Sequence, residues 1–353
     1  MSNPLAQDLD HVLTHTEGLW DGLRGQRVFI TGGTGFFGCW LLETFAWAND
    51  RLNLAARVVT LTRSPVKFRA KAPRLAAHPA IELWPGDILS CDFPAGAFAY
   101  VIHAAGDASP TLTTAGPLAV WDTLVAGTRR VLGFAHLCTA KSFLLTSSGA
   151  VYGRQPAEVS HLSEEYQGAP NPLDPRAAYG EGKRAAELLC ALYARRHGVP
   201  AKIARGFAFI GPYLPLDAQY AAGNFIRDAL AGGPIRVTGD GAAYRSYLYA
   251  ADLAAWLWTI LLRGEPCRPY NVGSEQAITI GDLARAVADC FPATAGRSAG
   301  SLRPEVQIAQ AATPGRPAER YVPSVARARH ELGLQQTVSL PEAIRRTIAW
   351  HTP

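Results

Sequence analysis

The chain has 353 residues, of which 48% are hydrophobic and 18% are charged, and its formal net charge is +5 at pH 7. This composition is typical of a globular protein with a sizeable core, arranged as one large domain or two small ones, and it excludes wholesale disorder. The positive excess is weak and contains no dense run of lysine and arginine. It therefore argues against nucleic-acid binding but is compatible with a pocket for a phosphorylated small molecule.

No stretch approaches the roughly 18 consecutive apolar residues that a membrane helix needs. The N-terminus has neither the basic start nor the apolar segment of a secretory signal, so we expect a cytoplasmic protein that does not bind membranes. The six cysteines are scattered, without a CxxC pair and without histidine at metal-ligand spacing. We therefore expect reduced, packed thiols and no metal site.

Residues 1–25 predict a helical extension, because apolar residues recur between Leu9 and Leu23. Short apolar runs typical of buried parallel strands follow and alternate with helical segments. The expected strands are residues 27–31, 57–62, 81–87, 100–106 and 142–148, and the expected helices include 119–136 and 178–197.

From about residue 206 the sequence changes to shorter pieces punctuated by proline and glycine. We therefore predict an α/β fold with two parts. Residues 26–205 form a doubly wound parallel sheet, and residues 206–353 form a smaller substrate-binding domain, some segments of which return to the sheet.

A glycine turn, GGTGFFG, directly follows the first expected strand and opens a helix. Gly32, Gly35 and Gly38 allow a tight turn, close approach of a dinucleotide pyrophosphate and close packing of the helix on the strand. Free N–H groups at the start of the helix face the phosphates in such a site. The pattern predicts a Rossmann-type dinucleotide-binding domain, with further cofactor contacts from the turn and from later strand ends. These are Thr34, Phe36, Phe37, Arg63, Asp87, Ile88, His103, Ala104, Ala105, Gly106, Tyr179 and Lys183.

The end of the second expected strand indicates which cofactor is bound. An acidic residue there would bind the adenosine ribose of NAD, whereas an arginine suits the 2′-phosphate of NADP. Here Arg63 occupies the strand end, with Lys67 and Arg69 nearby and no carboxylate. We therefore expect NADP or NAD, with Arg63 favouring NADP.

A Tyr-x-x-x-Lys pair, Tyr179 and Lys183, falls within the expected helix 178–197. Positions i and i+4 share one helix face, so the ammonium group can lie near the phenol and the nicotinamide ribose. A nearby positive charge lowers the tyrosine pKa from about 10 and makes the phenol usable as a general acid and base for an alcohol and ketone pair. Ser148 ends the strand SFLLTSS and is placed to hydrogen-bond the same oxygen. We predict that these three residues are catalytic.

The chain resembles the extended short-chain dehydrogenase/reductase superfamily, and within it the nucleotide-sugar epimerase/dehydratase family. The resemblance covers roughly residues 26–350. It rests on the order and spacing of TGGTGFFG, GDI, HAAG, AGTRRVL, TSSGAVYG, YGEGK, GP, GDGAAYRSYLYAADL, YNVGS and PGRP.

This resemblance implies a Rossmann domain with a smaller nucleotide-sugar domain, usually in a homodimer formed through a four-helix bundle. It implies that Arg245 and Arg316 hold the substrate diphosphate, by charge-assisted bonds of the kind arginine makes to phosphates. Asn224 would lie where the sugar nucleotide enters. The implied partner is a nucleotide-diphosphate sugar.

Several positions depart from the family pattern. Its dehydratases carry Asp-Glu just before Val-Tyr-Gly, and its decarboxylases carry Ser-Glu, whereas this chain has Gly149 and Ala150. These residues cannot transfer protons, so a 4,6-dehydratase is disfavoured unless Glu164 or Glu165 reaches in from the following loop. Two family asparagines are also replaced, by Leu124 and Ala208.

The leading hypothesis is an epimerase that inverts C4 of a nucleotide sugar through a 4-keto intermediate. The alternative is an NADPH-dependent 4-ketoreductase of a nucleotide-deoxysugar, which would use the same three residues and exchange its cofactor in each cycle. A third hypothesis is a dinucleotide sensor without catalytic activity. Such a protein would not require Ser148, Tyr179 and Lys183 together, so their presence favours an enzyme.

Overall fold

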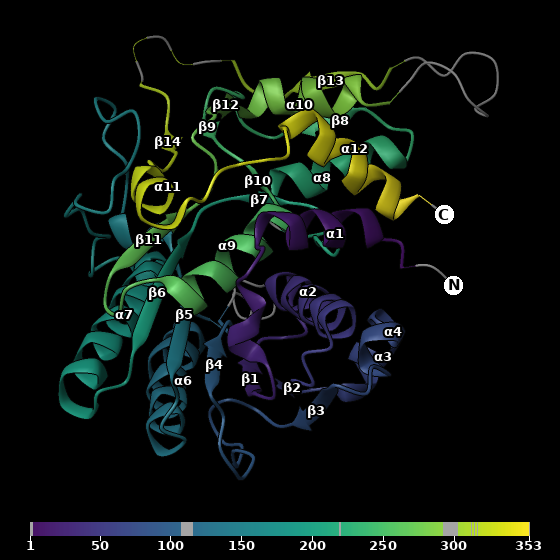
Figure 1. Cartoon of the computed structure of the whole chain (residues 1–353). Coiled ribbons are helices and arrows are strands. Elements are labelled where there is room, and N and C mark those ends of the chain that lie inside the picture. Colours follow the sequence, from purple (N-terminus) through teal and green to yellow (C-terminus); the bar gives the residue numbers. More distant parts are fainter. Residues whose placement is uncertain are drawn as a thin grey trace.

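The computed structural model describes residues 3–106, 116–218, 220–291, 303–311, 313, 315 and 317–352. Figure 1 shows a twisted sheet with helices packed around it, and above its carboxyl edge a second group of short strands and helices. The expected α/β fold with a smaller second part is confirmed.

The main sheet has seven parallel strands in the order β11-β6-β5-β4-β1-β2-β3. From β1 the chain adds β2 and β3 on one side of the sheet, and it then continues with β4, β5 and β6 on the other side. The strand order therefore reverses between β1 and β4, and doubly wound sheets bind their ligands in the crevice at the carboxyl ends of the strands at such a point. The bounds are β1 Arg27–Thr31, β2 Arg57–Thr62, β3 Ile81–Pro85, β4 Tyr100–His103, β5 Ser142–Ser148, β6 Ala201–Gly206 and β11 Pro269–Val272. All five predicted strands are present, although the third and fourth end earlier than expected.

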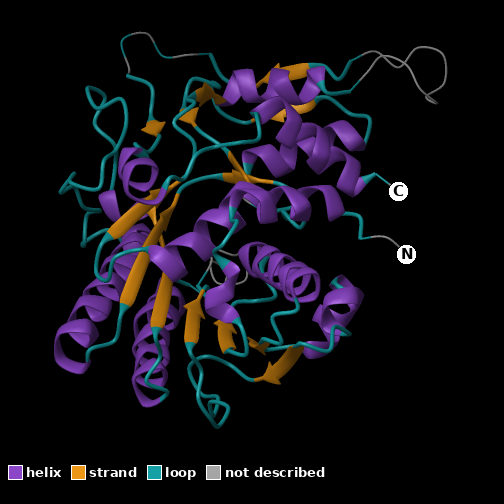
Figure 2. Cartoon of the chain, in the orientation of Figure 1, coloured by secondary structure: helices purple, strands orange, loops and turns teal. Residues whose placement is uncertain are grey.

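Helices cover both faces of this sheet, as Figure 2 shows. Side chains alternate along each strand, so Val28 and Ile30 of β1 join one core and Phe29 joins the other. The first core packs against α2 Phe36–Leu52 and α9 Ala250–Arg263, and the second against α6 Pro117–Leu137 and α7 Ala178–His197. Two short helices, α3 Pro65–Lys71 and α4 Pro73–Ala76, lie between β2 and β3.

The C-terminal part is built from short elements, as the punctuated sequence predicts. Two of its segments return to the main body: α9 packs on the sheet and β11 extends it next to β6. The remaining elements are β7 Phe209–Ile210, α8 Ala221–Leu230, β8 Ile235–Val237, β9 Tyr244–Arg245, β10 Leu248–Tyr249, β12 Ile278–Thr279, α10 Ile280–Asp289, β13 Val306–Ile308, β14 Arg320–Tyr321, α11 Ala326–Leu332 and α12 Leu340–His351.

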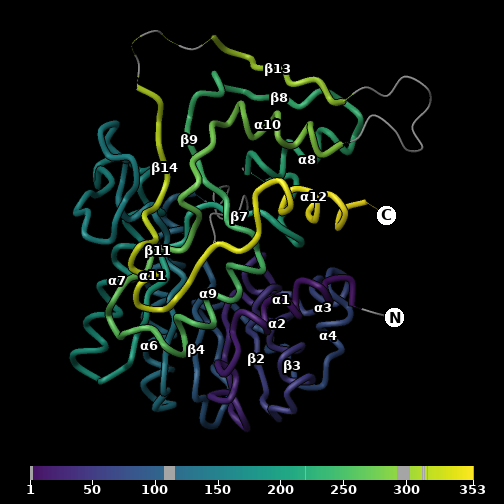
Figure 3. The backbone as a smooth tube through the Cα atoms, turned by 45° about the horizontal axis from the view of Figure 1, so that its top comes forward, coloured from purple at the N-terminus to yellow at the C-terminus, as the bar shows by residue number. Residues whose placement is uncertain are grey.

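The N-terminal extension forms α1 Ala6–His15 and a 3₁₀ turn, Trp20–Leu23. Helix α1 packs against α2 and α9, and the ring of Trp20 in the turn packs against that of Trp258 in α9. Asp8 of α1 is buried and accepts hydrogen bonds from Tyr249 (2.6 Å) and Arg346 (2.5 Å). The extension therefore joins the last helix of the chain, and both termini lie on the same side of the molecule (Figure 3). No helix in the described ranges is long and apolar enough to cross a membrane.

Candidate active site

A cavity of about 220 Å³ lies at the carboxyl ends of β1, β2, β3 and β4. It brings together most of the residues predicted to bind the cofactor. Its lining includes Gly32, Thr34, Gly35, Arg63, Asp87, Ile88, Ala104, Ala105 and Gly106.

The glycine turn forms the wall of this cavity next to β1. Gly32 has φ +72°, and a Cβ atom on Gly38 would lie 2.3 Å from the carbonyl oxygen of Gly32, so α2 can approach the turn this closely only with glycine there. Gly35 is the N-cap of α2, and it lines the cavity, so the unpaired N–H groups of the first helical turn are at the cavity edge. Lys71 fixes the turn by donating to the carbonyl oxygen of Thr34 (2.9 Å). Glycine walls and a helix N-terminus fit the pyrophosphate of a nicotinamide dinucleotide.

His103 does not take part in this cavity. Its ring is buried and bonded to the hydroxyl groups of Thr31 (2.7 Å) and Thr128 (3.0 Å). Burial, reinforced by the charge of Lys183, lowers the pKa of His103 to about 3. The imidazole is therefore neutral and links β1, β4 and α6, and a contact of His103 with the cofactor stays a prediction.

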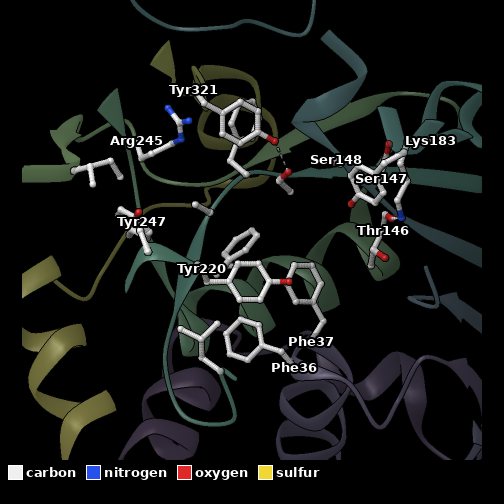
Figure 4. A pocket seen from close by; sticks show the side chains of 18 residues that line it. Phe36, Phe37, Thr146, Ser147, Ser148, Lys183, Tyr220, Arg245, Tyr247 and Tyr321 are labelled. Carbon is white, nitrogen blue, oxygen red and sulfur yellow. Dashed lines mark hydrogen bonds between the residues drawn. The ribbon is translucent and has the colours of Figure 1, made fainter. Parts of the chain in front are cut away.

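A second cavity, of about 410 Å³, lies between the sheet and the C-terminal part. It contains the three residues predicted to be catalytic, Ser148, Tyr179 and Lys183, together with Arg245. Figure 4 shows Ser148, Lys183 and Arg245 among the side chains that line it. The other walls are mainly aromatic: Phe36, Phe37, Phe207, Phe209, Tyr220, Tyr247 and Tyr321. Phe36 and Phe37 therefore line this cavity rather than the first.

Lys183 is buried beneath Tyr179 on the first turns of α7. Its ammonium nitrogen donates to the carbonyl oxygen of Thr146 on β5 (2.7 Å) and lies 5.7 Å from the centre of the Tyr179 ring. The i, i+4 spacing thus places a fixed positive charge beside the phenol, as the sequence predicts.

Ser148 ends β5 and caps the 3₁₀ turn Gly149–Tyr152, where its oxygen accepts a hydrogen bond from the N–H of Ala150 (3.1 Å). Its hydroxyl group is also hydrogen-bonded to the phenol of Tyr321 (Figure 4). Tyr321 comes from β14 and was not identified in the sequence, because nothing near it in the chain indicates which cavity it reaches.

The space beside Gly149, one of the two positions where the family's dehydratases and decarboxylases differ from this chain, is filled by other side chains. A Cβ atom on Gly149 would lie 2.7 Å from both the Phe207 ring and the phenol oxygen of Tyr321. Glu164 and Glu165 do not replace them: Glu164 accepts from the N–H of Asn271 (2.8 Å), and Glu165 pairs with Arg327. Among the described residues that line the larger cavity there is no carboxylate.

The two replaced asparagines have different surroundings. Leu124 is buried, and its side chain fills the space beside Gly106, which follows β4, and Gly182 of α7. Ala208 lies on the wall of the larger cavity, where its small side chain leaves room.

Of the three residues predicted to bind the substrate, the structure places Arg245 in the larger cavity. Arg245 lines the larger cavity, opposite the three catalytic candidates, and its guanidinium group lies 6.0 Å from the centre of the Tyr321 ring. Asn224 lies on α8 outside that cavity and bonds to Arg227 (3.3 Å). Arg316 lies outside the described residues.

Residues 28–273 match the family described as the NAD dependent epimerase/dehydratase family. The chain belongs to this family. Its relatives include UDP-glucuronic acid decarboxylase 6 of Arabidopsis thaliana, which is 32% identical over 319 residues, covering 90% of this chain and 86% of that protein. UDP-glucuronic acid decarboxylase 1 of Danio rerio is 31% identical over 92% of this chain and 72% of its own length.

Solved structures show the same fold. A UDP-N-acetylglucosamine 4-epimerase from Methanobrevibacter ruminantium has a TM-score of 0.75 and 20% identity, covering 93% of this chain and 98% of its own. The dTDP-glucose 4,6-dehydratase DesIV from Streptomyces venezuelae, solved with NAD bound, has a TM-score of 0.74 and 24% identity. The match covers 92% of this chain and 96% of that chain. The expected superfamily, the extended short-chain dehydrogenases/reductases, is confirmed, and a nicotinamide dinucleotide is the cofactor of the family.

Proposed function

We propose that this protein interconverts an alcohol and a ketone at C4 of a nucleotide-diphosphate sugar, and that the net reaction is epimerisation at C4. The observation that carries the proposal is the meeting of Ser148, Tyr179 and Lys183 in one cavity with Arg245 on the opposite wall. The volume of about 410 Å³ lies in the range of small-molecule sites. The relatives that are named for UDP-glucuronic acid support a nucleotide sugar as the substrate class.

In this mechanism Tyr179 removes the proton of the C4 hydroxyl group and later returns it to the same oxygen. Ser148 holds that oxygen by a hydrogen bond while it changes between hydroxyl and carbonyl. Lys183 stabilises the negative charge on the phenol oxygen of Tyr179 during the transfer. A nicotinamide dinucleotide held by Gly32, Gly35 and Lys183 would supply the hydride acceptor and donor that oxidation and reduction at C4 require.

The absence of a carboxylate beside Val151 and Tyr152 supports oxidation and reduction at C4 rather than dehydration. A proton at C5 needs a base, and no carboxylate among the described residues of the cavity can take it. Packing of Phe207 and Tyr321 against Gly149 supports the same conclusion.

A 4-ketoreductase acting on a nucleotide-deoxysugar is the second candidate, because Arg63 lines the cofactor cavity at the end of β2 and favours NADP. The aromatic walls near Ala208 also suit a methyl group better than a hydroxyl group.

We propose NADP as the preferred cofactor. Replacement Arg63→Ala is expected to raise the Kd of NADP about tenfold and leave that of NAD within twofold, measured by calorimetry, since it removes one charged phosphate contact.

We also propose a homodimer formed through α6 and α7. Trp121 of α6 and Leu188 of α7 are exposed and line one groove, and Leu192 of α7 is also exposed. An exposed apolar face of this kind is typical of an interface. Replacement Leu188→Glu is expected to convert the dimer to a monomer in sedimentation experiments, and a wild-type monomer would contradict the proposal.

The function is tested by incubating the purified protein with UDP-, GDP-, CDP- and dTDP-hexoses and with 4-keto-6-deoxyhexoses. An epimerase gives the C4 epimer without net cofactor turnover and keeps its dinucleotide through purification. Stoichiometric consumption of NADPH on a 4-keto sugar would select the reductase. No conversion of any of these sugars would overturn both.

A further inference from the structure

Tyr321 joins the ends of two sheet strands at the active site. Its phenol oxygen is hydrogen-bonded to the Ser148 hydroxyl at the end of β5, and it faces the N–H groups of Gly149 and Ala150. Its own hydroxyl donates to the carbonyl oxygen of Gly206 at the end of β6 across 3.5 Å, which is long for such a bond. Because the phenol proton is directed at Gly206, the proton shared between Ser148 and Tyr321 is that of the serine, and the donor bond of Tyr321 is the long one.

The position of this phenol is fixed by packing. The centre of the Tyr321 ring lies 4.6 Å from the centre of the Phe207 ring. The guanidinium group of Arg245 lies 6.0 Å from the centre of the Tyr321 ring. The phenol oxygen occupies the space that a side chain at position 149 would need. Gly149 and Tyr321 are thus fitted to each other.

The phenol is suited to hydrogen bonding and unsuited to proton abstraction. Burial raises the pKa of Tyr321 to about 12, so the phenol stays protonated at neutral pH. A serine oxygen offers one proton and two lone pairs. One lone pair of Ser148 already accepts from Ala150, so the second lone pair and the proton remain for Tyr321 and a substrate oxygen.

We propose that Tyr321 is a positioning residue that acts through Ser148, an inference that rests on the function proposed above. When the C4 oxygen of the sugar binds, Ser148 turns its proton from Tyr321 to that oxygen. The Tyr321 hydroxyl hydrogen then rotates from the carbonyl of Gly206 to the Ser148 oxygen. Ser148 thereby accepts two hydrogen bonds while it donates one, and this polarises its hydroxyl group toward the developing carbonyl. No covalent bond changes in this rearrangement.

The test compares Tyr321→Phe with wild type. This variant keeps the ring on Phe207 and removes only the hydroxyl group, so kcat is expected to fall about tenfold, the effect of one hydrogen bond. KM for the nucleotide sugar and Kd for the cofactor should stay within twofold. Tyr244→Phe is the matched control: Tyr244 is on the neighbouring strand β9, is absent from the cavity lining and should show wild-type kcat.

A double-mutant cycle shows whether Tyr321 acts through Ser148. In a Ser148→Ala background, Tyr321→Phe should cause no further loss of kcat, because the group that it polarises is gone. Gly149→Ala places a methyl group against the phenol and should reproduce most of the Tyr321→Phe loss. An unchanged kcat for Tyr321→Phe, or an equal loss with and without Ser148, would overturn the inference.

A readout without turnover separates this inference from the proposed reaction. A fluorotyrosine is placed at position 321 and titrated by ¹⁹F NMR in wild-type and Ser148→Ala protein. Loss of the serine donor should move the titration of the label to higher pH. Identical titrations would show that the contact is absent. If wild type converts no sugar but the titrations differ, the proposed function fails while the Ser148–Tyr321 contact stands.

Discussion

The ammonium nitrogen of Lys183 lies 5.7 Å from the centre of the Tyr179 ring. One turn of α7 creates this relationship, and the carbonyl oxygen of Thr146 holds the ammonium group in place. Because the nearby imidazole of His103 is neutral, the positive charge of this pair of residues is carried by Lys183. The pair is therefore equipped to support a proton transfer at the mouth of the sheet crevice.

Replacement Tyr179→Phe is expected to lower kcat by a factor of about 10² to 10⁴, the range for loss of a general acid and base. Cofactor binding should persist, because the ring and the walls of the other cavity remain. Rapid-mixing kinetics and cofactor titration measure the two effects. Tyr244→Phe serves as the control, and substantial turnover by Tyr179→Phe would show that another group moves the proton.

Arg245→Ala is expected to raise KM for the nucleotide sugar about 10- to 100-fold, because one charge-assisted contact to a diphosphate is lost. The Kd of the free nucleoside diphosphate should rise by the same factor, which calorimetry can measure. Arg285→Ala is the matched control, since Arg285 is exposed on α10 and pairs with Asp282 (2.7 Å). Equal affinities in wild type and Arg245→Ala would place the diphosphate elsewhere.

Asp8→Ala is expected to lower the free energy of unfolding by about 2–4 kcal/mol, because Arg346 loses a largely buried partner. Tyr249 also loses its hydrogen-bond acceptor. Urea denaturation followed by circular dichroism measures the change. The exposed carboxylate of Asp21 provides the comparison, since Asp21→Ala breaks only a surface pair with Arg24 and should cost less than about 1 kcal/mol. Equal losses would mean that α1 contributes little through Asp8.

Stability should decrease in mildly acidic solution because of His103. Its pKa is about 3 in the folded protein and about 6.5 when unfolded, so the unfolded chain binds more protons between these values. The stabilisation is present above pH 6.5 and is lost as the pH falls, by at most about 1.4 kcal/mol per pH unit from this group. Denaturation curves from pH 7 to pH 4 measure the slope. The glutamine of His103→Gln cannot titrate, so this variant should show a smaller dependence of the unfolding free energy on pH. An unchanged slope would mean that other groups cause the dependence.

The sequence by itself determined the α/β class, the five strands of the first half, the glycine turn and the Tyr179–Lys183 pair. These features depend on local pattern: buried strands read as apolar runs, and positions four residues apart share a helix face. Most of the residues that line the smaller cavity were predicted to lie together for the same reason, because parallel strands bring their carboxyl ends to one edge.

Only the tertiary structure decided which side chains close the larger cavity and what His103 does. Tyr321 contacts Ser148 from β14, which pairs with β9 in a small sheet of the C-terminal part, and no local sequence pattern indicates this contact. The space at Gly149 is likewise filled by residues distant in the chain. Contacts of this kind arise from packing between elements, so the sequence shows which carboxylates are missing but not what occupies their place.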